Sequence, residues 1–287
     1  MLNEMEGLSL THVDARVREA LAEDVGNGDV TTLATVPPDA RAVAIMIARE
    51  PIVLAGLIFA ERTFQLTSPE NKVEAVARDG QDFPRNSTLL RVSGDARSIL
   101  TAERVALNFA QRLSGVATAT RRFVEQVAGT KAKILDTRKT TPGWRDFEKY
   151  AVRCGGGSNH RRGLYDMVLI KDNHLAALQG ERPNAIVAAV RRARTQYPSL
   201  KIEVETDTLD QVEQALHAGA DIILLDNMAV LEMTKAVQMT AGKAKTEASG
   251  GINLANVRAV AETGVDFISV GAITHSARAV DIALDFQ

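Results

Sequence analysis

Residues 134–174 read ILDTRKTTPGWRDFEKYAVRCGGGSNHRRGLYDMVLIKDNH. Two short apolar runs, Ile134–Leu135 and Met167–Ile170, frame this stretch, and each ends abruptly in a polar cluster. Such runs are typical of buried strands in a parallel sheet. Between them, residues 144–154 have helical composition, and Gly155–Gly157 ends that helix. The stretch therefore predicts strand, helix and strand, with polar loops at both strand ends.

The same alternation continues to the end of the chain. Glu205, Asp226, Ser249 and Gly271 each follow an apolar run, at spacings of 21, 23 and 22 residues. That spacing fits one strand, one helix and two loops, which is the repeat of parallel βα units. Six strands are predicted: 133–135, 167–170, 201–204, 221–225, 244–248 and 266–270. Six strands are fewer than the eight of a complete barrel, so we expect an incomplete parallel α/β barrel.

The first hundred residues follow a different pattern, which indicates a strand-rich α+β unit. We expect a helix over 11–24 with Thr11 as its cap, a turn-rich segment at GNGDVTT (26–32) and a helix over 56–66. Strands are predicted over 42–49, 51–54, 73–77 and 89–94.

A long helix predicted over 101–127 links the two regions, with a bend or a second helix at Ser114-Gly115. We place the domain boundary within it. The predicted domains are an N-terminal α+β sandwich at 1–113, which the tail 275–287 could join, and an incomplete α/β barrel catalytic domain at 114–274.

Positive charge is concentrated where the active site of a barrel would lie. From Asp136 to Asp172 there are eight Lys and Arg against five Asp and Glu, although the whole chain has a net charge of −2. Active sites of parallel barrels form at the carboxyl ends of the strands. The gathered cations therefore predict a small, strongly anionic ligand.

Composition excludes several classes of function. An acidic chain with only 4% aromatic residues is a poor candidate for nucleic-acid binding. One cysteine, Cys154, excludes an intrachain disulfide framework and a multi-cysteine zinc site. No apolar run approaches the roughly 20 residues that span a bilayer, and the N-terminus does not read as a signal peptide. We expect a cytoplasmic protein with neither nucleic-acid nor membrane partners.

Four motifs of the central stretch carry a resemblance to a known family. TRKTTPG (137–143), EKYAVRCGG (148–156), NHR (159–161) and IKDNH (170–174) resemble the signature of the quinolinate phosphoribosyltransferases. The resemblance extends from Glu23-Asp24 and GDVTT (28–32) to SGG (249–251) and the last strand. It implies an N-terminal sandwich beside an incomplete barrel.

The resemblance also implies the reaction. Quinolinate and phosphoribosyl pyrophosphate would give nicotinate mononucleotide, pyrophosphate and carbon dioxide, a pentosyltransferase step of de novo NAD biosynthesis. Arg side chains bind carboxylates in a bidentate manner, so a dicarboxylate substrate suits the arginine cluster. Lys171, Glu205 and Asp226 are the expected catalytic residues. The positions that match the family's substrate-binding residues are Arg104, Thr137, Arg138, Lys139, His160, Arg161, Lys171, Glu205, Asp226, Ser249, Gly250, Gly251, Val270, Gly271 and Ala272.

Carboxylates in a cationic mouth need a separate explanation, since they would repel quinolinate. Glu205 and Asp226 suit the ribose hydroxyls of the donor or the magnesium ion that its pyrophosphate carries. We expect Mg²⁺ to be bound by the substrate near these two residues, with no site held by the protein alone. Backbone amides at Ser249–Gly251 and Val270–Ala272 suit the 5-phosphate, and a helix expected to begin near Asn253 would favour its charge.

The resemblance implies that the active site is shared between subunits. Arg104 lies in the segment ERVALN, near the predicted start of the long helix. In the family, the matching arginine reaches the active site of a neighbouring subunit. We therefore expect a homodimer or a higher homo-oligomer with shared active sites.

Three alternatives stay open on the sequence. A nicotinate phosphoribosyltransferase would share the donor, but its substrate has a single carboxylate. A molybdenum-transport-associated relative of the family is the second alternative, and a non-catalytic phosphosugar-binding module is the third.

Overall fold

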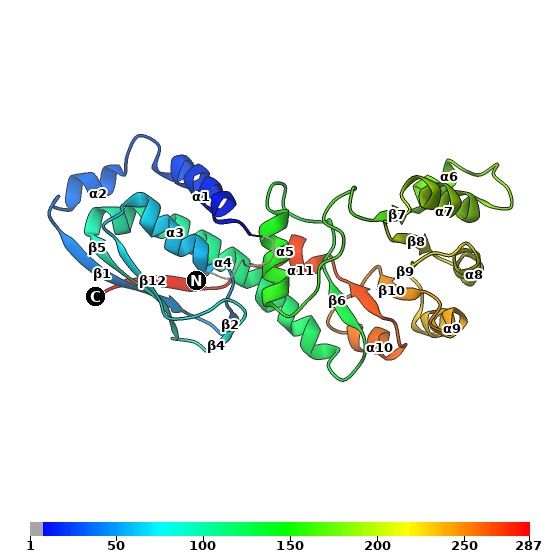
Figure 1. Cartoon of the computed structure of the whole chain (residues 1–287). Coiled ribbons are helices and arrows are strands. Elements are labelled where there is room, and N and C mark those ends of the chain that lie inside the picture. Colours follow the sequence, from blue (N-terminus) through cyan, green and yellow to red (C-terminus); the bar gives the residue numbers. More distant parts are fainter. Residues whose placement is uncertain (1–7) are drawn as a thin grey trace. The chain divides into compact units, whose positions relative to one another are not determined.

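The computed structural model describes residues 8–287 and divides into two compact units (Figure 1). Unit 1 contains the chain up to Arg121, the segment Pro142–Gly156 and the tail Ser276–Gln287. Unit 2 contains Arg122–Thr141 and Gly157–His275. This division differs from the predicted domains at 1–113 and 114–274. The helix within 142–156 packs against unit 1, although both of its neighbours in sequence belong to unit 2.

Unit 1 is built on an antiparallel sheet of four strands in the order β12-β1-β5-β3. The strands are β1 (Arg41–Ala48), β3 (Lys72–Ala75), β5 (Thr88–Asp95) and β12 (Ile282–Phe286). Alternate residues of β1, namely Ala44, Met46 and Ala48, are fully buried. This period of two places one face of the sheet against the core. A separate pair, β2 (Ile52–Val53) and β4 (Asp82–Phe83), completes the strands of this unit.

The helices of unit 1 bury aromatic residues against one another. They are α1 (Leu10–Val25), α2 (Val30–Thr35), α3 (Leu57–Thr67), α4 (Ala96–Gln126, which ends in unit 2) and α5 (Arg145–Cys154). Phe59 of α3 stacks on Phe109 of α4 at 4.8 Å between ring centroids, and Phe147 of α5 meets Phe59 edge-on at 5.0 Å. Trp144 also stacks on Phe109, at 5.3 Å between ring centroids. These contacts explain why α5 belongs to unit 1.

Unit 2 is the parallel sheet that the sequence predicted. Its strands are β6 (Lys133–Leu135), β7 (Val168–Ile170), β8 (Ile202–Thr206), β9 (Ile222–Asp226), β10 (Lys245–Ser249) and β11 (Phe267–Ser269). They pair in the order β6-β11-β10-β9-β8-β7, and neighbouring strands run parallel to one another. The edge strands β6 and β7 do not pair with each other, so the barrel is incomplete as expected.

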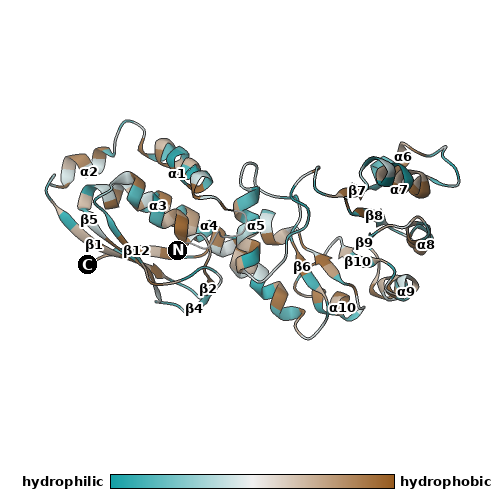
Figure 2. Ribbon diagram, viewed as in Figure 1, coloured by the Kyte–Doolittle hydropathy of each residue, from teal (hydrophilic) through white to brown (hydrophobic). Residues whose placement is uncertain are grey.

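Helices follow the strands of this unit, and most of them bury an apolar face. They are α6 (Asp172–Ala176), α7 (Ala185–Gln196), α8 (Leu209–His217), α9 (Val230–Thr240), α10 (Val257–Glu262) and α11 (Ala272–His275). In α8, Val212 and Ala215 are fully buried while the first turn carries exposed polar residues. Figure 2 shows the same division, with brown residues on the strands and on one side of the helices. The carboxyl ends of the strands remain available for a site.

Some predictions of secondary structure were wrong. Ser9, not Thr11, caps α1, and its hydroxyl accepts the N–H of His12 at 3.2 Å. The GDVTT segment, predicted to be a turn, contains the short helix α2, whose cap Asp29 accepts the N–H of Thr32. Capping side chains outside the apolar pattern decided both boundaries.

The long helix α4 also differs from the prediction. It runs unbroken for 31 residues, so the second helix proposed at Ser114-Gly115 does not exist. It begins at Ala96, and Arg104 therefore lies more than two turns inside it rather than near its start. Among residues 8–287, no helix combines the length and the apolar character that a bilayer span requires.

Gly115 provides a test of the packing between α4 and the C-terminal tail. An alanine in the middle of a helix ordinarily adds about 1 kcal/mol relative to glycine. A Cβ at Gly115, however, would lie 2.1 Å from the carbonyl oxygen of Arg278. We expect Gly115→Ala to lower the free energy of unfolding by about 1–3 kcal/mol, measured by chemical denaturation. Gly180→Ala is the control, because nothing lies within 4 Å of its Cβ. A stabilised Gly115→Ala variant would contradict this packing.

Candidate active site

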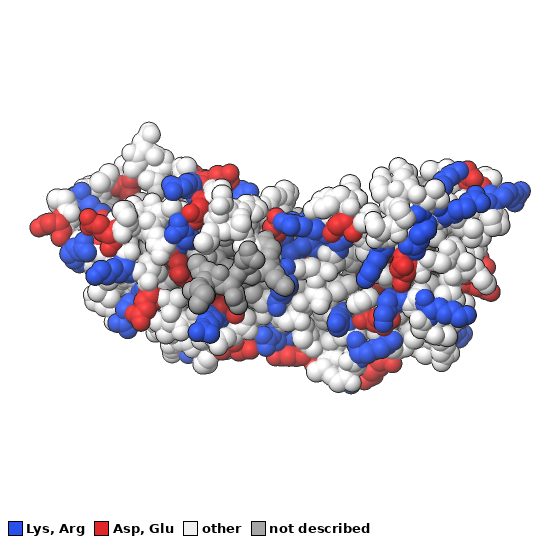
Figure 3. Space-filling model, in the orientation of Figure 1, with Lys and Arg blue, Asp and Glu red and all other residues white. Residues whose placement is uncertain are grey.

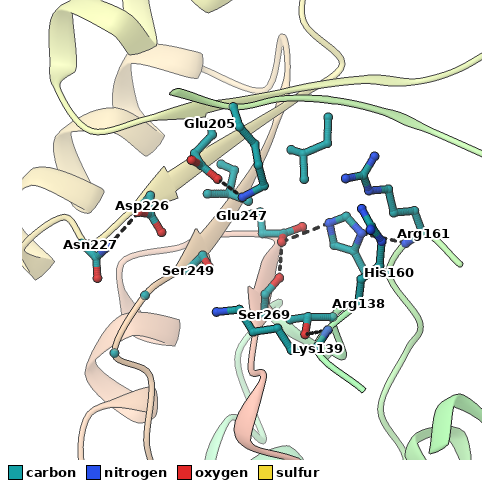
Figure 4. A pocket seen from close by; sticks show the side chains of 16 residues that line it. Arg138, Lys139, His160, Arg161, Glu205, Asp226, Asn227, Glu247, Ser249 and Ser269 are labelled. Carbon is teal, nitrogen blue, oxygen red and sulfur yellow. Dashed lines mark hydrogen bonds and ion pairs between the residues drawn. The ribbon is translucent and has the colours of Figure 1, made fainter. Parts of the chain in front are cut away.

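A cavity of about 480 Å³ opens at the carboxyl ends of the unit 2 strands. All of its walls come from unit 2, and Figure 4 shows the side chains that converge on it. Its lining residues are Thr137, Arg138, Lys139, His160, Arg161, Leu169, Lys171, Glu205, Leu224, Asp226, Asn227, Glu247, Ser249, Gly250, Gly251 and Ser269. Most of the site residues predicted from the sequence are therefore brought together in one place.

The period of two along each strand explains which side chains enter the cavity. On β9, Leu224 and Asp226 line it, whereas Leu225 between them is buried on the other side. Register carries the same face across the sheet, since Leu224 pairs with Glu205 of β8 and with Glu247 of β10. Parallel strands in register point equivalent residues to one side.

Cations occupy one side of the cavity. Arg138, His160 and Arg161 lie together in Figure 4, opposite Glu205 and Asp226. Burial and the neighbouring charge of Arg138 lower the pKa of Arg161. Two guanidinium groups held this close favour an anion between them. In the space-filling view, blue Lys and Arg side chains gather around the few red carboxylates of this region (Figure 3).

Lys171 and Glu205 form an ion pair at the rim. Lys171 follows β7, and its Nζ donates to Glu205 Oε2 at 2.5 Å. The Lys171 side chain is 46% exposed, whereas that of Glu205 is 15% exposed. A half-exposed pair of this kind contributes little to stability. Its ammonium group can therefore exchange partners at small cost.

His160 is fixed by contacts below the cavity. Its backbone N–H donates to Asp136 Oδ1 at 2.8 Å, and Asp136 is fully buried. Its Nε2 lies 3.1 Å from Glu203 Oε2 and 3.4 Å from Glu247 Oε1. Burial alone would lower the pKa of His160, but the two carboxylates outweigh this effect and raise it to about 10.

Two carboxylates of this floor, Glu203 and Glu247, were not among the predicted site residues. Glu203 lies two residues before Glu205 on β8, and Glu247 two residues before Ser249 on β10. Each therefore faces the same side as a residue that was predicted. Ser269 of β11, also missed, donates its hydroxyl to Glu247. The alternation of polar and apolar residues along β8 and β10 was a signal for Glu203 and Glu247 as residues on the cavity side.

The glycine loop after β10 approaches the end of β9. Gly250 has φ of +89°, and a Cβ there would lie 2.2 Å from the Oδ1 atom of Asn227. Asn227, which was not predicted, itself adopts φ of +54° and donates from Nδ2 to Asp226 at 2.7 Å. A residue larger than glycine at 250 would displace Asn227. The helix expected to begin near Asn253 is present as α10, but it begins four residues later, at Val257.

Four predicted residues do not line the cavity. Val270 is only 1% exposed and belongs to the core. Gly271 lies beside Lys139, since a Cβ on it would stand 3.3 Å from the Lys139 Cδ atom. Ala272 begins α11, directly after this glycine. Arg104 is exposed on α4 in unit 1 and contributes nothing to these walls.

Two groups of residues could hold a metal ion. His160, Glu203 and Glu247 each offer one ligand atom, all within 4.8 Å of one another. The same spacing suits an ion pair, which the protonated imidazole of His160 already forms with the two glutamates. Glu205 and Asp226, by contrast, stand on neighbouring strands and reach the open cavity. One or two such carboxylates beside substrate phosphates are what Mg²⁺ ordinarily uses.

Comparison with known proteins identifies the family to which the chain is similar. The family model described as "Quinolinate phosphoribosyl transferase, C-terminal domain" matches residues 116–285, and the corresponding N-terminal domain model matches residues 29–114. The chain is 46% identical over 277 residues to nicotinate-nucleotide pyrophosphorylase [carboxylating] of Mycobacterium leprae, covering 94% of this chain and 95% of the relative. It is 43% identical over 286 residues to the chloroplastic enzyme of that name from Arabidopsis thaliana, covering 94% and 81%.

A solved structure supports the same assignment. The nicotinate-nucleotide pyrophosphorylase of Francisella tularensis superimposes with a TM-score of 0.92 at 42% identity, and the match covers 98% of both chains. Nothing in these matches favours the molybdenum-transport-associated relative or the binding module. The two family models together span nearly the whole chain, and this protein belongs to the quinolinate phosphoribosyltransferase family.

Proposed function

We propose that the cavity of unit 2 is where this enzyme joins quinolinate to phosphoribosyl pyrophosphate. One observation carries the proposal. A cluster of cations and a pair of carboxylates face each other across one cavity, next to a glycine loop. A site for a dicarboxylate alone would have no use for Glu205 and Asp226. A site for a sugar phosphate alone would not need the arginine cluster.

The cationic side suits the two carboxylates of quinolinate. Arg138 and Arg161 can each form paired hydrogen bonds to a carboxylate. Such charge-assisted bonds are worth about 1.5–3 kcal/mol each, less the cost of desolvating the cations. His160 adds a third positive group from the floor.

Lys171 would change partners when quinolinate binds. In the structure its ammonium group pairs with Glu205 across the mouth. A quinolinate carboxylate competes for that ammonium group and releases the Glu205 carboxylate toward the donor ribose. Binding of one substrate thereby prepares the site for the other.

Phosphoribosyl pyrophosphate, the donor, fits the wall of the cavity opposite the arginine cluster. Amides of the Ser249–Gly251 loop suit the 5-phosphate, and Lys139, beside Gly271, suits a phosphate or pyrophosphate group. Glu205 and Asp226 suit the ribose hydroxyls, which donate hydrogen bonds. Magnesium carried by the pyrophosphate supplies charge neutralisation, and the same two carboxylates offer it oxygen atoms.

The chemistry follows from this placement. The pyridine nitrogen attacks the ribosyl C1 atom, the C1–O bond to pyrophosphate breaks, and positive charge develops on the ribose. Glu205 and Asp226 stabilise that charge electrostatically. The nitrogen then carries a formal positive charge. The C2–carboxylate bond breaks, carbon dioxide leaves, and the electron pair on C2 takes up a proton. Positioning and electrostatics suffice, and no side chain acts as a nucleophile.

We further propose that Arg104 completes this site from a second copy of the chain, in a homodimer or a larger assembly. The family resemblance supports this role, together with the exposure of Arg104 on α4. A cytoplasmic location stays a prediction from composition.

The first test is substrate selectivity. We expect quinolinate to be used at least about 100-fold more efficiently than nicotinate. Nicotinate has a single carboxylate, so in a site built for two it leaves buried cations unpaired. Pyrophosphate release with each acid, under identical donor and magnesium concentrations, measures kcat/KM. Comparable efficiencies would refute a dicarboxylate site.

Gly250→Val tests the donor side. The added side chain should push Asn227 aside and close the approach to the loop amides. We expect the KM for phosphoribosyl pyrophosphate to rise at least about tenfold, the loss of roughly one hydrogen bond to a charged group. The KM for quinolinate should change much less. Gly180→Val, at a glycine with no atoms within 4 Å of its Cβ, is the control. A rise confined to the quinolinate KM would place the phosphate elsewhere.

Complementation tests the shared site. Removing one cation from a buried carboxylate contact costs roughly 2–5 kcal/mol, so Arg104→Ala and Lys171→Ala should each be nearly inactive. Mixed subunits would form heterodimers in which one site lacks both cations and the other is intact. Activity should return to about a quarter of wild type under statistical exchange. Mixtures that exchange subunits, as mass spectrometry can verify, yet stay inactive would assign Arg104 to its own chain.

A further inference from the structure

The floor of the cavity contains a buried pair of carboxylates to which the mechanism above gives no role. Glu203 of β8 is 0% exposed and Glu247 of β10 is 1% exposed. No donor in the described part of the chain gives Glu203 a well-formed hydrogen bond at either oxygen. A buried carboxylate without donors is costly and is kept only where another charge compensates it.

The compensating charge is His160. Its Nε2 stands between the two carboxylates, at 3.1 Å from Glu203 and 3.4 Å from Glu247. Ser269 orients Glu247 through a hydrogen bond from the neighbouring strand β11. Carboxylates from two strands thus meet at one ring nitrogen, a third strand supports one of them, and the ring itself lines the cavity (Figure 4).

One contact instead favours the neutral form of the His160 ring. The backbone N–H of Arg161 lies 2.7 Å from Nδ1 of His160, which suits a neutral ring that accepts there. The carboxylates of Glu203 and Glu247 lie within 3.4 Å of Nε2. Burial and the charge of Glu247 raise the pKa of Glu203 to about 7, yet the attraction of the two carboxylates together outweighs one amide dipole in a buried site. Accordingly the pKa of His160 is raised to about 10, even though burial acts to lower it.

We propose that Glu203 and Glu247 are positioning residues for the reaction: from below the cavity their charge stabilises the doubly protonated ring of His160, so that the ring meets quinolinate as a cation. This inference rests on the proposed role of His160 in binding quinolinate. The other charged groups around the ring are Asp136 at its backbone N–H, Arg138 and Arg161 beside it, and the Lys171–Glu205 pair across the cavity.

The pH dependence of the isosteric variants tests the proposal. In the wild-type enzyme, whose His160 pKa is raised, the ring stays protonated below about pH 9, so kcat/KM for quinolinate should not fall on account of His160. In Glu203→Gln or Glu247→Gln, kcat/KM for quinolinate should begin to fall at a pH at least about one unit below the pH at which the wild-type ring loses its proton. In the double variant the fall should begin near the ordinary histidine value of about 6.5, which gives about a 100-fold loss at pH 8.5. Activity should return toward the wild-type value as the pH falls below 6.5.

Controls separate this role from a structural one. Asp266→Asn removes a carboxylate from the opposite end of the same sheet, where it accepts from Lys245 and Thr246. It should lower thermal stability without changing the shape of the pH profile. In a His160→Gln background, Glu203→Gln should leave the quinolinate KM unchanged, because no ring remains to be charged. The KM for phosphoribosyl pyrophosphate should respond weakly in every variant.

A direct readout is independent of turnover. The five histidines can be labelled with ¹⁵N, and the His160→Gln spectrum identifies the His160 signals. We expect His160 to titrate well above pH 8 in the wild type and lower in Glu203→Gln. The proposal is overturned if both titrate alike, if the variant pH profile is only a scaled copy of the wild type, or if the floor residues hold a stoichiometric transition metal. A wild type that titrates as expected but does not use quinolinate would refute the proposed function alone.

Discussion

Parallel pairing of the six strands in unit 2 is the constraint on which the site depends. Because the strands run in one direction, their carboxyl ends meet at one edge, and residues far apart in sequence become neighbours there. The period of two then sends alternate residues into the same cavity. Glu205, Leu224 and Glu247 come from three repeats and lie in one register row. A slip of one residue in β9 would turn Asp226 away and bring Leu225 into the cavity.

A cavity that gathers so many charges must neutralise them when no ligand is bound. The structure does this in pairs, Lys171 with Glu205 at the rim and His160 with Glu203 and Glu247 at the floor. The rim pair is partly exposed and can separate at little cost, whereas the floor pair is buried and cannot. Substrate binding is then an exchange of partners at the rim above a floor whose charge stays fixed.

Unit 1 shows how packing can override order along the chain. Its sheet takes β12 from the far C-terminus, and its aromatic cluster takes α5 from a segment flanked on both sides by unit 2. Phe147 and Trp144 hold α5 there through their contacts with Phe59 and Phe109. A boundary at a single residue cannot describe this arrangement, and for that reason the division at 113/114 differs from the one in the structure.

The βα repeat, the six parallel strands and most of the residues at their carboxyl ends could be predicted from the sequence, because periodicity and spacing are local properties of the chain. The motifs around Arg138, His160 and Lys171 also indicated the family. The groups beneath those residues, by contrast, became apparent in the folded structure. Glu203 and Glu247 become partners of His160, and Ser269 a partner of Glu247, because the strand register joins segments that are far apart in the chain. The starts of α1 and α2 likewise depended on cap hydrogen bonds of Ser9 and Asp29, which the apolar pattern does not record.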